Sequence, residues 1–305
     1  MDGKNVPFEK ATIPIFAHTL HYGSGVFEGI RCYKTRKGPA VFRLKEHILR
    51  LQRSARCMLM EIPYDLDGIV RGVWEAIADN AWEACYVRPL VYRGAKKLGV
   101  DPTGADVHLA ICTWEWGAYL GEEGLEKGIR IMTSSWMKNP ANSMPTKAKV
   151  TGAYANSVVA KGEAIAMGFD EAMLLDRRGF IAEGSGENVF YVSGGVLHAV
   201  DNLSALEGIT RESVIVLAGD LGIPVQVGSA TKDQLYNADE IFFTGTAAEI
   251  TPIREYDLRK IGEGRRGPVT ERLQKAFTKA VRGEDERHID WCEYAPAVRT
   301  AKAKG

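Results

Sequence analysis

Apolar residues near the start of the chain follow two spacings, one typical of strands and one typical of helices. Residues 26–33 form a largely apolar run that predicts a strand, and residues 40–42 predict a second strand after a turn at 37–39. From Leu44 to Met58, apolar residues recur every three or four positions, which predicts a helix with one buried face. The chain thus begins with strands that lead directly into a helix.

The following segments continue this mixture. A second helix is expected after Asp67, whose side chain can cap its first turn, with Ile69, Val73 and Ile77 on one face. Residues 86–92 and 107–113 are rich in apolar and β-branched side chains and predict two more strands.

A glycine-containing polar stretch then interrupts the regular pattern. Residues 116–124 include three glycines, which favours an irregular connection over a helix or strand. We therefore place an interdomain linker at residues 117–125. It would join a small N-terminal domain, residues 1–116, to a large C-terminal domain, residues 126–305.

The second half of the chain also mixes strands and helices. In order, we expect a strand at 129–134, a helix at 153–167, a hairpin with strands at 171–175 and from 180 onward, a strand at 188–192, a helix capped by Thr210 and ended by Gly222, and a helix that starts at Pro268. No regular βαβ rhythm runs through the chain. We therefore expect an α+β fold, with two α/β-type domains and a cleft between them.

Composition is ordinary for a globular protein and narrows the choice of partners. The chain has 305 residues, 45% of them hydrophobic and 26% charged, with a formal net charge of zero. Nucleic acid or an anionic membrane as main partner would favour a basic excess, so we expect neither. A local basic pocket for one small anion remains compatible with this balance.

The termini and cysteines point to a cytoplasmic protein. Residues 1–5 lack the apolar segment of a signal peptide, and no apolar run reaches membrane-spanning length. The five cysteines are scattered without a C-x-x-C pair, which suits reduced thiols in a cytoplasm. The six histidines show no metal-binding spacing, so we expect no metal site.

Residues 145–154 (Pro-Thr-Lys-Ala-Lys-Val-Thr-Gly-Ala-Tyr) place a lysine in a loop before a predicted helix. Lys149 lies five residues before Tyr154. A lysine can attack a carbonyl when burial or a neighbouring charge keeps its amine neutral. On spacing alone, two solvated loop lysines, Lys147 and Lys149, are the simpler interpretation.

Residues 180–190 place two carboxylates, Glu183 and Glu187, around a Gly-Ser-Gly tract between apolar strands. The segment is compatible with a carboxylate pair in a pocket, because glycine allows close approach of the backbone. It is equally compatible with a polar turn.

Two further segments could bind an anion through backbone N–H groups. Residues 206–212 (Leu-Glu-Gly-Ile-Thr-Arg-Glu) open a predicted helix, whose first N–H groups are unpaired. Residues 243–252 place small side chains directly after an apolar strand. A simple helix cap and a hairpin corner are the competing interpretations. No P-loop or dinucleotide-binding fingerprint is present.

Together with residues 21–31 (His-Tyr-Gly-Ser-Gly-Val-Phe-Glu-Gly-Ile-Arg), these four segments resemble the branched-chain amino acid aminotransferases. These enzymes belong to the fold-type IV pyridoxal phosphate enzymes. The resemblance runs from about His18 to about Phe277, and the order and joint presence of the motifs make it specific. It reverses the interpretation of Lys149 as a solvated residue. One departure lies at the N-terminus, where the family usually has a short tryptophan-bearing strand.

The resemblance implies a residue set for the cofactor, pyridoxal 5′-phosphate. Lys149 matches the lysine that forms a Schiff base with it and moves the proton of the substrate Cα. Tyr154 would hydrogen-bond the phenolate oxygen, and Glu183 would pair with the pyridine nitrogen. The residues that match phosphate contacts are Arg50, Gly208, Ile209, Thr210, Gly245 and Thr246. Periodicity alone would instead place Arg50 on a solvated helix face.

The resemblance also implies the reaction and the substrate contacts. The amino group would pass between branched-chain L-amino acids (Leu, Ile, Val) and 2-oxoglutarate, giving branched 2-oxo acids and L-glutamate. Arg88 can bind the distal carboxylate of glutamate. The backbone N–H groups of Thr246 and Ala247 can bind the α-carboxylate. The other matching positions are Phe27, Arg31, Tyr86, Trp116 and Tyr119. Tyr22 and Val100 would reach the partner subunit's site in a homodimer or higher homo-oligomer.

Other enzymes of the same fold are the nearest alternatives. A D-amino acid or (R)-amine transaminase would use the same lysine, but residues 27–31 and Arg88 argue against it. An aminodeoxychorismate lyase would use Lys149 to eliminate pyruvate. From another class, a catalytically inactive binding protein is disfavoured by the intact Lys149, Tyr154 and Glu183.

Overall fold

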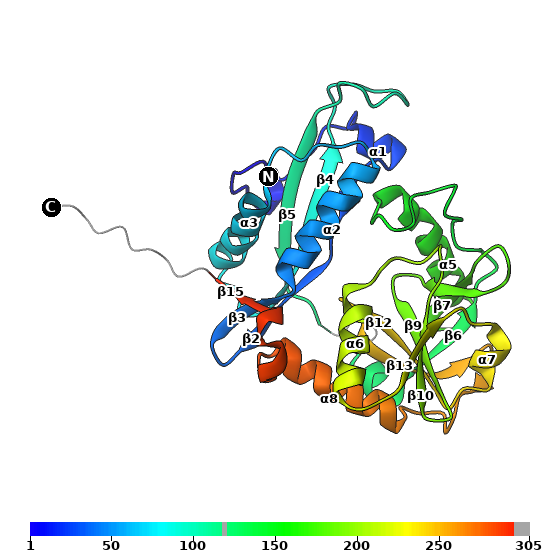
Figure 1. Cartoon of the computed structure of the whole chain (residues 1–305). Helices are drawn as coiled ribbons and strands as arrows, with labels where there is room; N and C mark the ends of the chain where they lie inside the picture. Colours follow the sequence, from blue (N-terminus) through cyan, green and yellow to red (C-terminus); the bar gives the residue numbers. More distant parts are fainter. Residues whose placement is uncertain (118–120, 296–305) are drawn as a thin grey trace.

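The computed structural model describes residues 1–117 and 121–295, in which two β-sheets are each covered by helices (Figure 1). The first sheet contains β1 (Val26–Phe27), β2 (Ile30–Thr35), β3 (Gly38–Phe42), β4 (Cys85–Arg93), β5 (Val107–Trp114) and β15 (Cys292–Tyr294). Its strands lie in the order β1–β4–β2–β3–β15, and β5 also pairs with β4. All of these pairs are antiparallel.

Two amphipathic helices, α2 (Leu44–Cys57) and α3 (Leu66–Asp79), pack on this sheet. The shared core includes Ile48 and Leu51 from α2 and Val73 from α3, all fully buried. The predicted cap at Asp67 is wrong by two residues. Asp65 is the N-cap, because its carboxylate accepts a 2.7 Å hydrogen bond from the Gly68 backbone N–H.

The strand predicted at residues 26–33 is interrupted in the structure. It forms β1 and β2, with Glu28 and Gly29 between them. The Glu28 N–H donates to the Pro89 carbonyl at 2.9 Å, so the chain stays attached to β4 through the break. A Cβ on Gly29 would lie 1.9 Å from the Tyr86 hydroxyl, so only glycine fits beside that ring. Nearer the N-terminus lie the short helices η1 (Phe8–Lys10) and α1 (His18–Tyr22).

The second sheet is larger and mixed. Its strands are β6 (Ile129–Thr133), β7 (Glu171–Leu175), β8 (Ile181–Gly184), β9 (Asn188–Ser193), β10 (Val196–Val200), β11 (Val225–Gly228), β12 (Glu240–Gly245), β13 (Glu249–Tyr256) and β14 (Arg259–Lys260). They lie in the order β11–β10–β9–β12–β13–β6–β7–β8, with β14 beside β13. The pairs β6–β7, β10–β11 and β6–β13 are parallel and the others antiparallel.

Helices connect and cover the second sheet. The helical elements are η2 (Thr151–Ala153), α5 (Tyr154–Ala166), α6 (Ile209–Asp220), α7 (Lys232–Tyr236), α8 (Pro268–Val281) and η3 (Glu286–Trp291). α6 and α8 lie side by side and bury Leu217 and Leu273 against the sheet (Figure 1). The prediction that α8 starts at Pro268 is confirmed. The prediction that Thr210 caps α6 is wrong: Gly208 is the N-cap, and Thr210 lies within the first turn.

Two observations bear on the predicted domain boundary at 117–125. A short helix, α4 (Glu122–Lys127), begins within the predicted linker, which is therefore not wholly irregular. The C-terminal strand β15 returns to pair with β3 of the first sheet. The mixed α and β composition is confirmed, whereas the division at 117–125 stays a prediction.

Candidate active site

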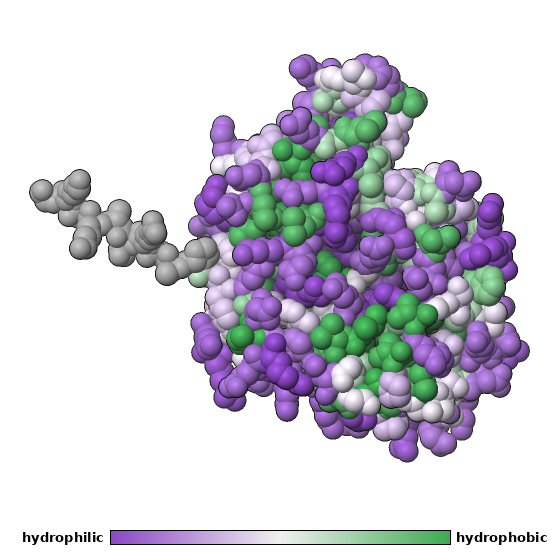
Figure 2. Space-filling view, in the orientation of Figure 1, coloured by the Kyte–Doolittle hydropathy of each residue, from purple (hydrophilic) through white to green (hydrophobic). Residues whose placement is uncertain are grey.

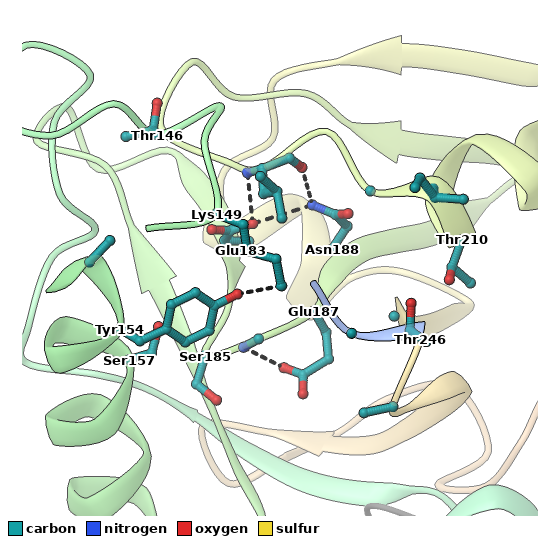
Figure 3. Close-up of a pocket in the computed structure, with 18 of the residues that line it drawn as sticks. Thr146, Lys149, Tyr154, Ser157, Glu183, Ser185, Glu187, Asn188, Thr210 and Thr246 are labelled. Carbon is teal, nitrogen blue, oxygen red and sulfur yellow. Dashed lines mark hydrogen bonds between the residues drawn. The ribbon is translucent and has the colours of Figure 1, made fainter. Parts of the chain in front are cut away.

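A pocket lies where helices and loops of the two sheets meet. Figure 3 shows side chains from α5, the β8–β9 turn, the start of α6 and the end of β12 around it. The structure brings together eleven of the predicted residues here: Arg50, Tyr86, Lys149, Tyr154, Glu183, Gly208, Ile209, Thr210, Gly245, Thr246 and Ala247.

Lys149 reaches the pocket from a segment that bridges to β1. Its backbone is fixed by hydrogen bonds to the Phe27 N–H and the Ser54 hydroxyl, both 3.0 Å long. The Nζ atom donates to the Tyr154 hydroxyl at 2.6 Å (Figure 3). Lys147 instead donates to the carbonyls of Asn202 and Ala205 and does not line the pocket. Lys149 is therefore the lysine that the fold presents to a ligand.

The surroundings of Lys149 favour its neutral amine. Burial, with the nearby positive charge of Arg50, lowers the pKa of Lys149 to about 8. Burial and the charge of Glu183 raise the pKa of Tyr154, so the phenol keeps its proton at neutral pH. An amine that is partly neutral near pH 8 is suited both to attacking a carbonyl and to accepting a proton.

Glu183 lies on β8 with both carboxylate oxygens engaged. Oε1 is 2.6 Å from Nζ of Lys138, and Oε2 accepts from the Leu206 N–H at 3.0 Å and from Asn188 at 3.3 Å. Although burial favours the neutral amine of Lys138, the adjacent carboxylate raises the pKa of that lysine. The pocket thus contains an anchored carboxylate that faces the same space as Lys149 (Figure 3).

Another part of the pocket lining is suited to a phosphate. The N-terminus of α6, a helix of twelve residues, opens onto it at Gly208, Ile209 and Thr210. A Cβ on Gly208 would lie 2.0 Å from Oδ1 of Asn188, so glycine is required for this approach. The buried Thr244 hydroxyl lines the same space and has no hydrogen-bond partner among the described residues.

Arg50 adds a cation beside this helix terminus. Its side chain is buried and lines the pocket, so the solvated position expected from periodicity is wrong. The guanidinium pairs with Glu28 through Nε at 2.7 Å and Nη2 at 2.9 Å, and Nη1 donates to the Glu207 carbonyl at 2.8 Å. A residue off the apolar stripe is buried here because a charged partner receives it.

A second carboxyl group, Glu187, is buried in the floor of the pocket. Its Oε2 accepts a 3.0 Å hydrogen bond from the Gly186 N–H. Burial and the neighbouring charge of Glu171 raise the pKa of Glu187 to about 8. The two carboxyls that the sequence places around Gly-Ser-Gly therefore differ: Glu183 lies beside a cation, and Glu187 favours its protonated form.

Aromatic rings and Arg88 form an apolar wall next to the pocket. The Phe27 ring packs edge-on against Tyr154 at 4.8 Å between centroids, and Tyr86 packs against Trp116 at 4.8 Å. The Arg88 guanidinium lies over Phe27 at 4.7 Å from the ring centroid. Its buried Nε has no hydrogen-bond partner among the described residues. Phe27, Arg88 and Trp116 do not themselves line the pocket.

Other predicted substrate contacts are not part of the pocket lining. Arg31 pairs with Glu249 at 3.0 Å, which Tyr33 also contacts at 2.9 Å. Tyr22 and Val100 are 45% and 82% exposed on the surface. Tyr119 lies outside the described residues.

Sequence reasoning missed several residues that the structure places in or beside the site. Lys138, Asn188 and Thr244 line the pocket, and Glu28 contacts both Arg50 and His47. Lys138 carried no signal, because it is one lysine in an irregular loop. Glu28 lies within residues 27–31, but the sequence alone does not show that its side chain is buried.

Two features are absent from the part of the chain that the structure describes. No group of three or more His, Cys, Asp or Glu side chains is placed to hold a metal ion in that part of the chain. Within it, no helix combines the length and apolarity required to cross a membrane.

Comparison with known proteins gives concordant results. The pattern of the amino-transferase class IV family matches residues 25–256. The chain is 49% identical over 290 residues to a branched-chain-amino-acid aminotransferase of Pseudomonas aeruginosa, covering 95% of this chain and 94% of that relative. It is 44% identical over 294 residues to the one from Escherichia coli, covering 96% and 95%.

Solved structures agree. The crystal structure of the T.th. branched-chain amino acid aminotransferase with pyridoxamine 5′-phosphate has a TM-score of 0.93 and 52% identity, covering 95% of each chain. The Escherichia coli enzyme has a TM-score of 0.94 and 44% identity, covering 96% of this chain and 97% of that one. These findings confirm the resemblance and the expected fold. The chain therefore belongs to the amino-transferase class IV family and, within it, to the branched-chain-amino-acid aminotransferases.

Proposed function

We propose that the protein is a pyridoxal phosphate-dependent transaminase. It transfers the amino group between branched-chain L-amino acids and 2-oxoglutarate and yields branched 2-oxo acids and L-glutamate. The observation that carries this proposal is the partly buried amine of Lys149, which is 2.6 Å from the Tyr154 hydroxyl and lies in one pocket with the N-terminus of α6. The relatives named branched-chain-amino-acid aminotransferases support the substrate class.

The residues of the pocket fit this cofactor. When bound, pyridoxal phosphate supplies a carbonyl that carries the amino group and a ring that withdraws electrons from the substrate carbon. The N-terminus of α6, Arg50 and Thr246 would hold its phosphate, and Glu183 would pair with its pyridine nitrogen. The Thr244 hydroxyl, which has no hydrogen-bond partner in the described part of the chain, lines the pocket and can meet a polar group of the cofactor. Solved relatives contain pyridoxamine 5′-phosphate and N-(5′-phosphopyridoxyl)-L-glutamate.

Lys149 moves the proton in this reaction. With a pKa of about 8, its Nζ is partly neutral under physiological conditions and can accept the α-proton of the amino acid. The same nitrogen would then give the proton to C4′, the cofactor carbon that is bonded to the transferred amino nitrogen. Tyr154 holds Nζ in position, because its hydroxyl accepts the hydrogen bond from the amine.

The wall beside the pocket explains how two kinds of side chain are accepted. Phe27, Tyr86 and Trp116 offer an apolar surface for a branched aliphatic chain. Arg88, whose Nε has no partner among the residues that the structure describes, binds the distal carboxylate of glutamate or 2-oxoglutarate. The backbone N–H groups of Thr246 and Ala247 hold the α-carboxylate.

The protein acts as a homodimer or a higher homo-oligomer. His18 links helix α1 to the loop before Val100 through a 2.9 Å contact with the Gly99 carbonyl, and its ring packs at 4.7 Å on Tyr22. Tyr22 and Val100, which we propose reach a partner's site, are thus connected through His18, and both are exposed. Figure 2 shows hydrophobic side chains around α1 on this face. A Val100→Asp variant tests the contact by sedimentation, because a charge there would weaken an apolar interface.

The expected location is the cytoplasm. All five cysteines are free thiols, which suits a reducing compartment. We propose small-molecule substrates as the partners, and neither nucleic acid nor a membrane. Fractionation of cells that express the chain would test the cytoplasmic location.

Absorption spectroscopy of the purified protein tests the reaction. L-leucine without acceptor should convert the cofactor band to that of the pyridoxamine form, and 2-oxoglutarate should restore it. D-alanine is the parallel sample and should cause no change. A response to D-alanine alone would assign the protein to D-specific transamination, and the Lys149→Ala variant controls for non-enzymatic exchange.

A further inference from the structure

Glu28 is a fully buried carboxylate that lies behind the pocket and not in its lining. It occupies the break between β1 and β2, where its N–H still donates to the Pro89 carbonyl. The next residue, Gly29, allows the chain to pass the Tyr86 hydroxyl without a side chain. The local backbone therefore directs Glu28 inward, toward helix α2.

Two side chains of α2 receive this carboxylate. Arg50 donates from Nε to Oε1 at 2.7 Å and from Nη2 to Oε2 at 2.9 Å, which is a two-point contact along one edge of the guanidinium. Nδ1 of His47 is 2.8 Å from Oε2. Burial alone would raise the pKa of Glu28, but Arg50 and His47 lower it well below its usual range. The carboxylate is therefore ionised and fixed from two directions.

Two N–H groups of the Arg50 guanidinium remain available to a ligand. A guanidinium has five N–H groups. Within the described part of the chain, Glu28 accepts from two of them and the Glu207 carbonyl from one, so two remain, one on each terminal nitrogen. Arg50 lines the same pocket as Gly208, Ile209 and Thr210, and its contact with the Glu207 carbonyl lies directly before the start of α6.

Stability alone is a weak explanation for this arrangement. A buried ion pair gains little over apolar packing, because removing two charges from water offsets their attraction. The two-point contact does fix the rotation of the guanidinium, which a single contact would leave variable. Orientation of Arg50 is therefore the property that this contact supplies.

We propose that Glu28 is a positioning residue, which acts through Arg50 to orient the two remaining N–H groups of that guanidinium toward the cofactor's phosphate. This inference rests on the proposed function, in which Arg50 contacts that phosphate. His47 supports the same carboxylate. Glu28 itself touches neither the substrate nor the cofactor.

The test measures binding of pyridoxal phosphate to the full-length protein after removal of its cofactor, by quenching of protein fluorescence. Glu28→Gln should weaken binding roughly tenfold or more, the loss typical of removing a partner that orients a ligand-binding side chain. Glu240→Gln is the matched control. Glu240 is also a buried carboxylate, but it caps α8 through Thr270 and Val269 and does not line the pocket. The Glu240→Gln substitution should lower the stability of the protein without changing its affinity for pyridoxal phosphate.

A second variant covers the case in which Glu28→Gln does not fold. Glu28→Asp keeps the buried charge but is one methylene shorter, so it cannot hold both guanidinium nitrogens in place. It should also bind pyridoxal phosphate more weakly than the unchanged protein. Unaltered affinity in either folded variant would overturn the proposal.

A double-mutant cycle separates positioning from a general structural effect. Once Arg50 is replaced in Arg50→Met, adding Glu28→Gln should cause little further loss of affinity. An undiminished additional loss would show that Glu28 does not act through Arg50. If Arg50→Met alone leaves affinity unchanged, the proposed phosphate contact of Arg50 fails as well, whereas the spectral response to L-leucine still tests transamination independently.

Discussion

Nζ of Lys138 lies 2.6 Å from Oε1 of Glu183, and both side chains are largely buried. Glu183 therefore has a cationic partner within the protein in addition to the Leu206 N–H and Asn188. The ion pair fixes the carboxylate on the side of the pocket that faces Lys149. It also means that the charge of Glu183 is already partly balanced before any ligand contacts it.

Removing Lys138 should destabilise the protein. Lys138→Met leaves Glu183 as a buried charge without its ionic partner, for which a loss of about 3–5 kcal/mol is typical. Urea unfolding measures the effect. The double variant Lys138→Met/Glu183→Gln should recover part of the loss, because its buried amide carries no charge. Equal stability of the single variant and the unchanged protein would contradict this reasoning.

Covalent attachment of the cofactor should depend on Lys149 alone. Lys149→Ala is expected to abolish the pyridoxal adduct that borohydride traps, as detected by mass spectrometry of the reduced protein. Lys147→Ala is the matched control and should retain the adduct, because Lys147 donates to two backbone carbonyls outside the pocket. The assignment would be wrong if the two variants behaved in the opposite way.

Local sequence pattern predicts some features of this fold and not others. The helix at α2 and the start of α8 follow from apolar spacing and from Pro268, which are local signals. The break at Glu28 does not follow, because it depends on Tyr86 approaching Gly29 from another strand. Periodicity likewise predicts a solvated Arg50, since the buried carboxylate that receives it lies 22 residues earlier in the chain.

The site shows the same division. Lys149 and Tyr154 follow from motif order within the family resemblance, and the structure brings them within 2.6 Å. Lys138 does not, because only the fold places its loop beside Glu183. For Thr210 the local pattern predicts the wrong role, that of the α6 cap, whereas a tight approach by Asn188 requires glycine at the cap itself.

The buried carboxyl of Glu187 should make stability depend on pH. Its pKa is raised to about 8 in the folded protein from the ordinary value of 4.5, so between these values the unfolded chain binds fewer protons. Stability should therefore fall as pH rises from about 5 to 8, by up to about 1.4 kcal/mol per pH unit from this group. Glu187→Gln should remove that dependence, since the amide resembles the protonated carboxyl.

Urea unfolding of cofactor-stripped protein at pH 5, 6.5 and 8 measures this effect. Glu163→Gln is the control, because hydrogen bonds from Ser134 and Ser135 lower the pKa of Glu163, whose titration then lies below the range tested. The difference in unfolding free energy between that control and the unchanged protein should stay constant from pH 5 to 8. A constant difference for Glu187→Gln as well would show that Glu187 is ionised throughout.

Arg88 should distinguish the acidic substrate from the aliphatic ones. Its guanidinium lies over the Phe27 ring, and within residues 1–117 and 121–295 its Nε has no hydrogen-bond partner, so it can meet a second carboxylate there. Arg88→Met should raise KM for 2-oxoglutarate roughly tenfold to a hundredfold, the range expected for losing hydrogen bonds to a charged group. KM for L-leucine should change far less. Arg31→Met is the comparison variant and should leave KM for 2-oxoglutarate nearly unchanged, because Arg31 is already paired with Glu249. A selective loss of 2-oxoglutarate binding in Arg31→Met would instead assign the role to Arg31.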